Sequence, residues 1–582
     1  MLFTSMVESE DWSAYANQPA QPNLTTKLVP QLRRYLKSQL PDYMIPVTFV
    51  VLDEMPLTPN GKVNRRALPE PQTEQPQSRE DVIAPRTLVE QQIADLWKAI
   101  LSLDAVSIDD NFFDLGGHSL LAAELLFRLQ EQFEVELSLI NLFMSPTVEG
   151  QAQLVCDRKS GTPTDQPKLD LWAEATLAED IYPDTDTPAN VDNPKAVLLT
   201  GATGFLGGFL IHEILQQTQA DIYCLVRADD EASARQRIQT NLQQYALWQP
   251  EQGDRIIPIV GDLSQPHLAL SPEQFQTLAK TVDVIYHNGA MVNFMHPYPV
   301  MKAANVSATE TILRLASRVK VKPVHFLSTM GVFSPIAYDD GQVIREQDAA
   351  ERPEGLYGYT QSKWVAEKLL AIAQARGIPT TIYRPAWIEG HSQTGVCNRS
   401  DFLRSLIKGC LQLGVAPDWA MPVDFVSVDY ISQAIVHLSQ QQPAGQAFNF
   451  ANPQSIMWNQ LVDWITAYGY RLQRVPYSDW LTLIKAQVRP GSDNALAPFL
   501  AFLTDLSPEY PMTIPEMYFQ THGLGFDTQN LQRGLADLGT SYPAVTALLS
   551  TYFDYFISSG FLEPPLKPLE RRQAISAIRK SR

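Results

Sequence analysis

Cysteine is scarce in this chain of 582 residues, which holds only four: Cys156, Cys224, Cys397 and Cys410. They form neither a CxxC pair nor a metal-ligand spacing, so free thiols in a reducing compartment are favoured over a disulfide framework. No apolar run reaches the roughly 18 residues that a membrane span requires. The opening residues, MLFTSMVESEDW, lack the basic region of a signal peptide. We therefore expect a soluble cytoplasmic protein, with no membrane partner and no metal centre.

Positive charge is also in short supply, with 45 Lys and Arg against 64 Asp and Glu and a net charge of −19 at pH 7. The basic residues form no long run, so nucleic acid is not an expected partner. The length predicts two to four domains.

Two stretches rich in proline and polar residues divide the chain. PEPQTEQPQSRED, at 69–81, lacks an apolar period, and so does the loose stretch around 157–192, as is typical of linkers. The predicted order is a first segment at 1–70, a linker at 71–84, a middle segment at 85–156, a linker at 157–192 and a third segment at 193–582.

The middle segment has the apolar spacing of a small helical bundle. Helices are predicted around 88–100, after Ser119 and at 139–143. Taken alone, LGGHSL predicts a helix start with Ser119 as its N-cap. A hydrolase turn of the GxSxG type is excluded, because Leu120 and Leu121 follow the serine.

The full stretch DNFFDLGGHSLLAAELL resembles the core motif of peptidyl carrier proteins from nonribosomal peptide synthetases. In that family the serine of GGHS carries a covalent 4′-phosphopantetheine arm, attached by a separate phosphopantetheinyl transferase. The resemblance implies that Ser119 is the attachment site and that upstream synthetase modules are partners. A helix N-terminus suits the phosphodiester, because its backbone donors and dipole favour negative charge.

The first segment contains LPDYMIP and NGKVNR, which resemble the C-terminal end of an adenylation domain. The resemblance implies a small α+β remnant in which Lys62 contacts an acyl phosphate. Asn64 stands where the family more often has aspartate, and Lys62 can equally be a surface lysine in an Asn-Gly turn. We expect that the chain does not activate a substrate by itself, and that it is a fragment of a longer synthetase or a truncated product.

The third segment alternates apolar strands with helical stretches. AVLLTG, DIYCLV, IIPIVG, DVIYHNG, VHFLST and TTIYRP are the predicted strands. This alternation predicts an α/β Rossmann-type doubly wound parallel sheet over about 193–450. A smaller substrate-binding part is expected mostly at 450–582, where no side chain can be assigned a role.

The stretch VLLTGATGFLGGFL places a glycine turn between a strand and a helix, which favours a dinucleotide site. Such a turn needs positive φ and close approach to a pyrophosphate. The residues expected to line it are Gly201, Thr203, Gly204, Phe205, Leu206 and Gly207.

Arg227 ends the second predicted strand, where an NAD enzyme commonly has an acidic residue. An arginine there favours the 2′-phosphate of NADP through bidentate pairing, and Arg235 or Arg237 could add a second contact. The alternative is a solvated arginine at the end of a strand.

The pair Tyr359 and Lys363 in YTQSK lies on one face of a predicted helix, and Ser328 and Thr329 end an apolar strand. A Tyr-x-x-x-Lys pair alone is often structural. Combined with the glycine turn it predicts a proton-transfer site, in which the ammonium lowers the tyrosine pKa. Thr329 can donate to an oxygen that gains charge.

Much of the third segment resembles extended short-chain dehydrogenases, and its finer match is to thioester reductase domains. The resembling pieces include LLTGATGFLG, CLVRA, GDLS, YGYTQSKWVAEKLL and YRPAWIEGHSQTG, and HNGA departs from the family at Gly289. The resemblance implies that Asp262 and Leu263 lie by the adenine and that NADPH reduces a carrier-bound acyl or peptidyl thioester. Tyr359 would supply the proton, Thr329 would stabilise the oxyanion, and Lys363 would lower the Tyr359 pKa and hold the nicotinamide ribose.

Three alternatives stay open at this point. They are a carrier fused to a redox-inactive condensing release domain, a sugar-nucleotide epimerase or dehydratase of the same superfamily, and a non-catalytic docking module. The acyl group, the choice of aldehyde or alcohol and the oligomeric state are not determined by these motifs.

Overall fold

The computed structural model describes residues 83–117, 119–135, 137, 139–160, 169–185, 187–339, 341–398, 401–441, 444–489, 492–507, 510, 512–519, 524–539 and 542–565. The chain divides into two compact units, which we describe separately: one contains residues up to 135 with 145–160, and the other contains 136–144 and 161 onward. The predicted adenylation remnant at 1–70, with Lys62, lies outside the described residues.

The carrier segment is helical, as predicted. Its helices are α2 (Leu88–Leu101), α3 (Ser119–Phe133), α4 (Leu139–Met144) and α5 (Val148–Lys159). A capping box of Thr87 and Glu90 starts α2. The buried Trp97 ring packs against Phe112 at 5.0 Å between centroids, and its indole N–H donates to Gln151 Oε1 at 3.0 Å. The last helix, α5, extends three residues past the predicted boundary at 156.

All six predicted strands belong to one parallel sheet of seven strands, in the order β12-β7-β5-β4-β1-β2-β3. This order reverses on either side of β1, which is the arrangement of a doubly wound fold. The strands are β1 (Ala196–Thr200), β2 (Asp221–Val226), β3 (Ile256–Val260), β4 (Val284–His287), β5 (Val324–Leu327), β7 (Thr380–Pro385) and β12 (Ala447–Phe450).

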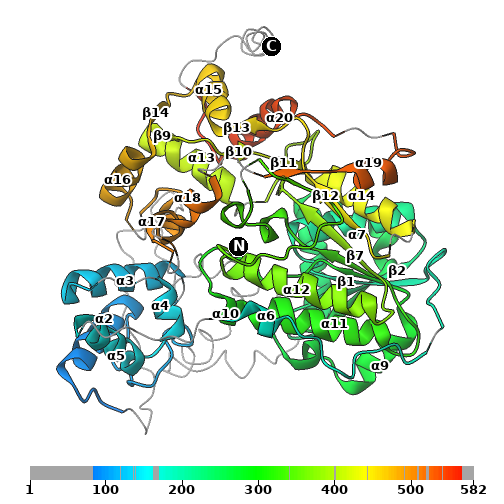
Figure 1. Cartoon of the computed structure of the whole chain (residues 1–582), viewed down its shortest axis with the longest axis horizontal. Coiled ribbons are helices and arrows are strands. Elements are labelled where there is room, and N and C mark those ends of the chain that lie inside the picture. Colours follow the sequence, from blue (N-terminus) through cyan, green and yellow to red (C-terminus); the bar gives the residue numbers. More distant parts are fainter. Residues whose placement is uncertain are drawn as a thin grey trace, which may run out of the picture. The chain divides into compact units, whose positions relative to one another are not determined.

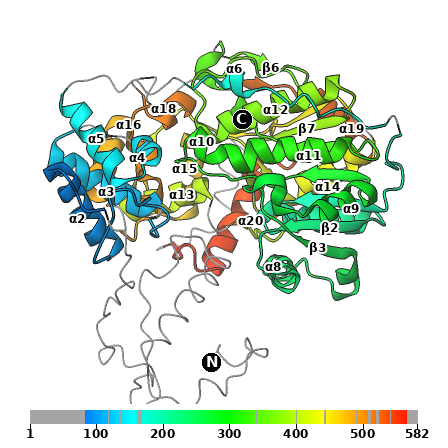
Figure 2. The same ribbon diagram turned by 90° about the horizontal axis from the view of Figure 1, so that it is seen from below.

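Helices cover both faces of this sheet. Successive residues of a strand point to opposite faces, so neighbouring strand residues pack against different helices. Leu198 packs with α9, α11 and α12, whereas Val197 and Leu199 pack with α7, α8 and α14. Figures 1 and 2 show α11 and α12 lying side by side along one face. The helices are α7 (Phe205–Gln217), α8 (Glu231–Gln244), α9 (Pro272–Thr281), α10 (Tyr298–Lys302), a π-helix (Ala303–Ser307), α11 (Ala308–Ser317), α12 (Gly358–Ala375) and α14 (Val428–Gln440).

A smaller lobe packs around its own core, which draws on residues 397–425 as well as 456–562. Most of this core lies after residue 450, but residues 397–425, which follow β8, also contribute to it, while α19 (Gln529–Gly534) packs back on the sheet layer. The remaining elements are β8 (Trp387–Glu389), α13 (Phe402–Leu413), β9 (Val415–Asp418), β10 (Pro422–Val423), β11 (Phe425–Ser427), β13 (Ile456–Met457), α15 (Trp458–Tyr468), β14 (Gln473–Pro476), α16 (Tyr477–Gln487), α17 (Leu500–Thr504), α18 (Ile514–Phe519) and α20 (Val545–Ser558).

The predicted linker at 157–192 differs from the structure in its second half. Leu171, in the short helix α6 (Leu171–Glu174), is buried in the same cluster as side chains of α11 and α12, together with Leu177 and Ile181. Three apolar side chains in a proline-rich stretch carry no period, so the sequence pattern did not reveal that they are buried.

Candidate active site

The glycine turn lies directly after β1, as predicted. Gly201 has φ +73°, and a Cβ there would lie 2.7 Å from the Asn288 side-chain nitrogen and from Gly289 Cα. A Cβ on Gly207 would lie 2.0 Å from the Gly201 carbonyl oxygen. Both positions therefore require glycine, the first for its conformation and the second for the close approach of α7 to the turn.

The other predicted residues of the turn form the start of α7. Gly204 is the N-cap, with no side chain bonded to the free backbone donors. Phe205 packs on Phe209 and Tyr245, and Leu206 is buried, so only their backbone can face a phosphate. Thr203 is half-buried. Uncapped N–H groups beside a glycine turn fit a pyrophosphate.

Two guanidinium groups meet at the end of β2. Arg237 on α8 donates to the backbone carbonyl of Arg227, and the nearby Arg227 charge, with burial as the larger cause, lowers the pKa of Arg237. Arg235 is directed elsewhere, since it donates to the Ile256 carbonyl at 3.3 Å and pairs with Glu231. Two neighbouring guanidinium groups fit a bound phosphate.

Asp262 and Leu263 follow β3 beside the glycine turn. Asp262 Oδ1 accepts from the Ser264 backbone N–H and hydroxyl, both at 2.8 Å. A Cβ at Gly289 would lie 2.7 Å from Leu263 Cδ1, so the departure from the family at this position places a small residue where Leu263 approaches.

The two hydroxyl residues after β5 have different surroundings. Ser328 is buried and donates to Glu367 Oε1 at 2.5 Å. Thr329 is half-buried, and its hydroxyl oxygen accepts from the Gly331 N–H at 3.1 Å, which leaves its own proton free to be donated. A Cβ at Gly331 would lie 2.9 Å from Thr360, so the Thr329 turn packs against the start of α12 beside Tyr359.

Lys363 is 2% exposed and lies one helical turn from Tyr359 on α12. Its Nζ donates to the Leu327 carbonyl at 2.7 Å and lies 4.4 Å from the centroid of the Phe326 ring. Burial lowers the pKa of Lys363 to about 7, although the Glu367 carboxylate acts in the opposite direction.

The expected lowering of the Tyr359 pKa is not observed. Burial raises the pKa of Tyr359 well above its ordinary value of 10.0. The physical reason is that Lys363 is itself buried and donates to the Leu327 carbonyl, so desolvation dominates at the phenol. Tyr359 therefore keeps its proton at neutral pH, which suits a proton donor.

Asn305 is a site residue that sequence patterns did not identify. It lies in the π-helix, and its side chain exchanges hydrogen bonds with the Met291 backbone at 2.7 and 2.9 Å. Its Nδ2 also donates to Ser362 Oγ at 2.8 Å, and Ser362 donates to the Tyr359 carbonyl at 2.7 Å. Asn305 thus connects the loop after β4 to α12, and π-helical turns are frequent at functional sites.

A buried chain of hydrogen bonds joins the glycine turn to the same π-helix. The Gly289 N–H donates to Thr200 Oγ1, which lies 2.8 Å from His287 Nδ1. His287 Nε2 lies 3.0 Å from Thr309 Oγ1, which donates to the Asn305 carbonyl. Burial lowers the pKa of His287 to about 3, so this ring is neutral. Because Thr309 donates its own proton to the Asn305 carbonyl, its oxygen accepts from His287, which places the ring proton on Nε2.

Behind Lys363, Glu367 and Arg384 form a buried ion pair at 2.7 Å. Arg384 Nε also donates to Glu367 at 3.0 Å, and its guanidinium lies over the Phe333 ring. Glu367 therefore accepts hydrogen bonds from two side chains, those of Arg384 and Ser328.

Aromatic side chains border Tyr359 on its other side. Tyr357 lies 6.5 Å from the Tyr359 ring centroid, Phe294 lies 5.8 Å from Tyr357, and Phe502 lies 5.1 Å from Phe294. Phe402 contacts Phe294 and Phe502. Phe402 and Phe502 of the smaller lobe thus extend an apolar wall from Tyr359.

In the carrier, Ser119 is the first residue of α3. The turn before it explains why the GGHS motif has a glycine at position 117. A Cβ on Gly117 would lie 2.3 Å from the Phe112 ring, whose side chain is buried. The Gly117 N–H donates to the Phe112 carbonyl at 2.9 Å. Glycine is required there because Phe112 fills the core directly beneath the turn.

Within the described part of the chain, no three His, Cys, Asp or Glu side chains are grouped as metal ligands. Over the same residues, none of the helices has the length and apolar character needed to cross a membrane.

Two family descriptions match the chain. Residues 91–155 match the phosphopantetheine attachment site family, and residues 199–435 match the NAD-binding family described as male sterility protein.

Several known proteins are similar to this one. A linear gramicidin synthase of Brevibacillus parabrevis is 42% identical over 82% of this chain and 10% of its own length. L-2-aminoadipate reductase of Schizosaccharomyces pombe is 30% identical over 97% of this chain and 42% of its own length. This chain therefore spans less than half of each of these two relatives.

Among solved structures, the terminal R domain from the myxalamid PKS-NRPS biosynthetic pathway is 40% identical, with a TM-score of 0.62. The match covers 68% of this chain and 98% of that domain. A thiolation-reductase di-domain from an archaeal non-ribosomal peptide synthetase shares the fold, with 24% identity and a TM-score of 0.61 over 83% of this chain and 99% of the di-domain.

Proposed function

Because the chain belongs to the family of terminal reductase domains of nonribosomal peptide synthetases, here preceded by a phosphopantetheine-attachment domain, we propose that it releases a carrier-bound acyl or peptidyl thioester by reduction. The observation that carries the proposal is the convergence of a glycine turn, a guanidinium pair and the Thr329, Tyr359 and Lys363 set at the carboxyl ends of parallel strands.

In this proposal a separate phosphopantetheinyl transferase modifies Ser119, and upstream synthetase modules supply the acyl or peptidyl chain. The reaction takes place in the cytoplasm, where a reducing environment suits four cysteines that are all free thiols.

NADPH, when bound, supplies the hydride. The glycine turn and the uncapped start of α7 would hold the pyrophosphate, and Arg227 with Arg237 would bind the 2′-phosphate. Asp262 and Leu263 would border the adenine, and Lys363 would hold the nicotinamide ribose.

The chain's own residues manage the charge on the thioester oxygen. Thr329 donates a hydrogen bond as negative charge develops there, and Tyr359 delivers the proton. Addition of hydride and proton to the carbonyl, followed by cleavage of the C–S bond, gives an aldehyde and the free thiol. A second hydride transfer would give an alcohol.

Tyr359→Phe tests the assignment, because it keeps the ring and removes the hydroxyl. Single-turnover NADPH oxidation on a loaded thioester should fall by roughly 10²–10⁴-fold, as is typical when a general acid is lost. NADPH binding, measured by a separate titration, should survive. Lys363→Ala should weaken both, because it also removes a ribose contact.

Near-normal hydride transfer in Tyr359→Phe would mean that another group donates the proton. Release of a product without NADPH oxidation by the unmodified protein would instead favour a redox-inactive condensing domain. Mass spectrometry of the released product separates aldehyde from alcohol.

A further inference from the structure

Residues 169–185 and 187–192, which we call the docking arm, lie along the helices of the catalytic face instead of hanging free before β1. Leu171, Leu177 and Ile181 are each at most 6% exposed and belong to the same buried cluster as side chains of α11 and α12. Further along, the Ala189 N–H donates to the Val321 carbonyl at 2.8 Å, so the arm is held at both ends.

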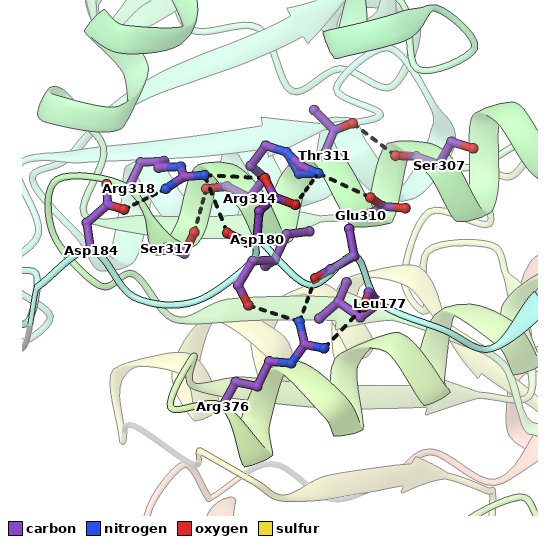
Figure 3. Close-up of polar contacts among 12 residues, drawn as sticks. Leu177, Asp180, Asp184, Ser307, Glu310, Thr311, Arg314, Ser317, Arg318 and Arg376 are labelled. Atoms are coloured by element: carbon purple, nitrogen blue, oxygen red, sulfur yellow. Dashed lines mark hydrogen bonds and ion pairs between the residues drawn. The ribbon is translucent and has the colours of Figure 1, made fainter.

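Three arginine side chains bind the middle of the docking arm. Arg376, just after α12, donates to the carbonyls of Leu177, Ala178 and Ile181 at 3.1, 2.6 and 3.1 Å (Figure 3). On α11, Arg314 pairs with Asp180 at 3.2 Å. Arg318 pairs with Asp184 at 2.6 Å, as Figure 3 also shows.

The first turn of the docking arm contacts the helices that carry the site. Glu174 accepts from the Tyr298 hydroxyl at 2.9 Å and pairs with Lys302 at 2.7 Å, both on α10, which runs into the π-helix of Asn305. Trp172 packs edge-on against Trp364 of α12 at 4.9 Å.

Resting on the proposed function, we infer that the docking arm is a fixed anchor for the carrier. The tether that governs delivery of the Ser119 thioester then runs only from Ser160, at the end of α5, to Asp170, the N-cap of α6. At about 3.3–3.6 Å per residue this segment spans at most roughly 35 Å. A free linker over 157–192 would span more than three times that distance.

A short tether raises the local concentration of the thioester at the site, which falls roughly as the −3/2 power of tether length once the sites can be reached. Insertions on either side of the docking arm test whether the arm is a fixed anchor or part of a flexible linker. Roughly 24 Gly and Ser residues between Gly161 and Thr162 lengthen the anchored tether more than threefold. The same insertion between Asp192 and Asn193 leaves it unchanged, because the arm stays docked.

The assay is single-turnover NADPH oxidation by the full chain with the thioester loaded on Ser119. A free pantetheine thioester is assayed in parallel. The upstream insertion should slow reduction of the loaded thioester by about sixfold. The downstream insertion should leave it at the unmodified rate. Neither insertion should change reduction of the free thioester, which checks that the catalytic site is intact.

A variant with two substitutions releases the docking arm itself. Leu177→Asp with Ile181→Asp places two carboxylates in the apolar cluster shared with α12, so the arm should detach. Hydrogen exchange should then lose protection at the amides of Asp184 and Ala189, which donate to Ser317 and Val321. Reduction of the loaded thioester should fall several-fold, and the downstream insertion should now lower it further. Leu506→Asp, at a leucine that is 60% exposed, is the matched control and should change none of these readouts.

Equal slowing by both insertions would overturn the anchor, because the whole linker would then act as the tether. Slowing by neither insertion would overturn it as well. If the unmodified protein reduces no thioester, the proposed function fails, and the anchor is decided by exchange alone. Protected Asp184 and Ala189 amides in the downstream-insertion protein support it, and their loss refutes it.

Discussion

Replacing Glu367 by glutamine tests how the negative charge of this carboxylate affects the pKa of Lys363. Glu367 is 5% exposed and pairs with Arg384, which is 3% exposed, at 2.7 Å. It also accepts a hydrogen bond from the Ser328 hydroxyl at 2.5 Å. Its charge raises the pKa of Lys363, whereas burial lowers that pKa. Gln keeps the shape but leaves two buried cations without a carboxylate.

The stability cost follows from the burial of the pair. Removing one partner of a buried ion pair costs about 3–5 kcal/mol, because the other charge is left uncompensated. A reductase segment of roughly 390 residues has an unfolding entropy near 0.8 kcal/mol/K at about 2.1 cal/mol/K per residue. The expected fall in Tm is therefore about 4–6 °C by calorimetry.

The same change should alter the pH dependence of turnover. Lys363 has a pKa of about 7 in the folded protein and an ordinary value of 10.5, so it loses its proton as the pH rises through 7. Below pH 7 Lys363 is protonated in both the folded and the unfolded state, so the full free-energy cost of burying its charge lowers the stability. Between about pH 7 and 10.5 only the unfolded state holds this proton, so the free energy of unfolding rises with pH. In Glu367→Gln the pKa of Lys363 falls further, so the basic limb of kcat/KM should move to lower pH.

Glu310→Gln is the control, since Glu310 pairs with Arg314 on the surface of α11 at 3.3 Å. Surface pairs contribute about 0–1 kcal/mol, so its Tm and pH profile should match those of the unmodified protein within about 1 °C. A Glu367→Gln protein that behaves like this control in both measurements would refute the role given to Glu367.

Three further predictions concern the proposed sites. Incubation with a phosphopantetheinyl transferase and coenzyme A should add one phosphopantetheine mass, and Ser119→Ala should not gain it. Arg227→Ala should reduce the preference for NADPH over NADH by about tenfold to a hundredfold, because a hydrogen bond to a charged group contributes about 1.5–3 kcal/mol; equal use of both cofactors by the unmodified protein would contradict this assignment. Thr329→Ala should lower turnover by about 10²–10³-fold with unchanged NADPH affinity, whereas Ser328→Ala should lower stability by about 1.5–3 kcal/mol, because it removes the hydrogen bond that Ser328 donates to the charged Glu367 carboxylate.

The contrast between Ser328 and Thr329 illustrates where sequence patterns stop. Both hydroxyls follow the same apolar strand, and their order along the chain does not say which one is free. Glu367, 39 residues away, decides the matter, because it accepts the hydrogen bond that the Ser328 hydroxyl donates. The Thr329 hydroxyl only accepts, from the Gly331 N–H, so its own proton stays available. The Tyr359 pKa is a similar case: helical spacing places Lys363 beside it, but the depth of burial sets the direction of the shift.

Local chemistry sufficed for the parallel sheet, the glycine turn, the carrier helices and the Tyr359 and Lys363 pair, because strand alternation, positive φ at Gly201 and helical spacing each depend on residues a few positions apart. Tertiary structure alone decided the roles that depend on distant partners. Asn305 joins the site through Met291 and Ser362, Arg237 is chosen over Arg235 by its approach to Arg227, and the docking arm is ordered by the carbonyls that Arg376 binds. Each of these contacts joins segments whose separation along the chain carries no period, so only the folded arrangement brings them together.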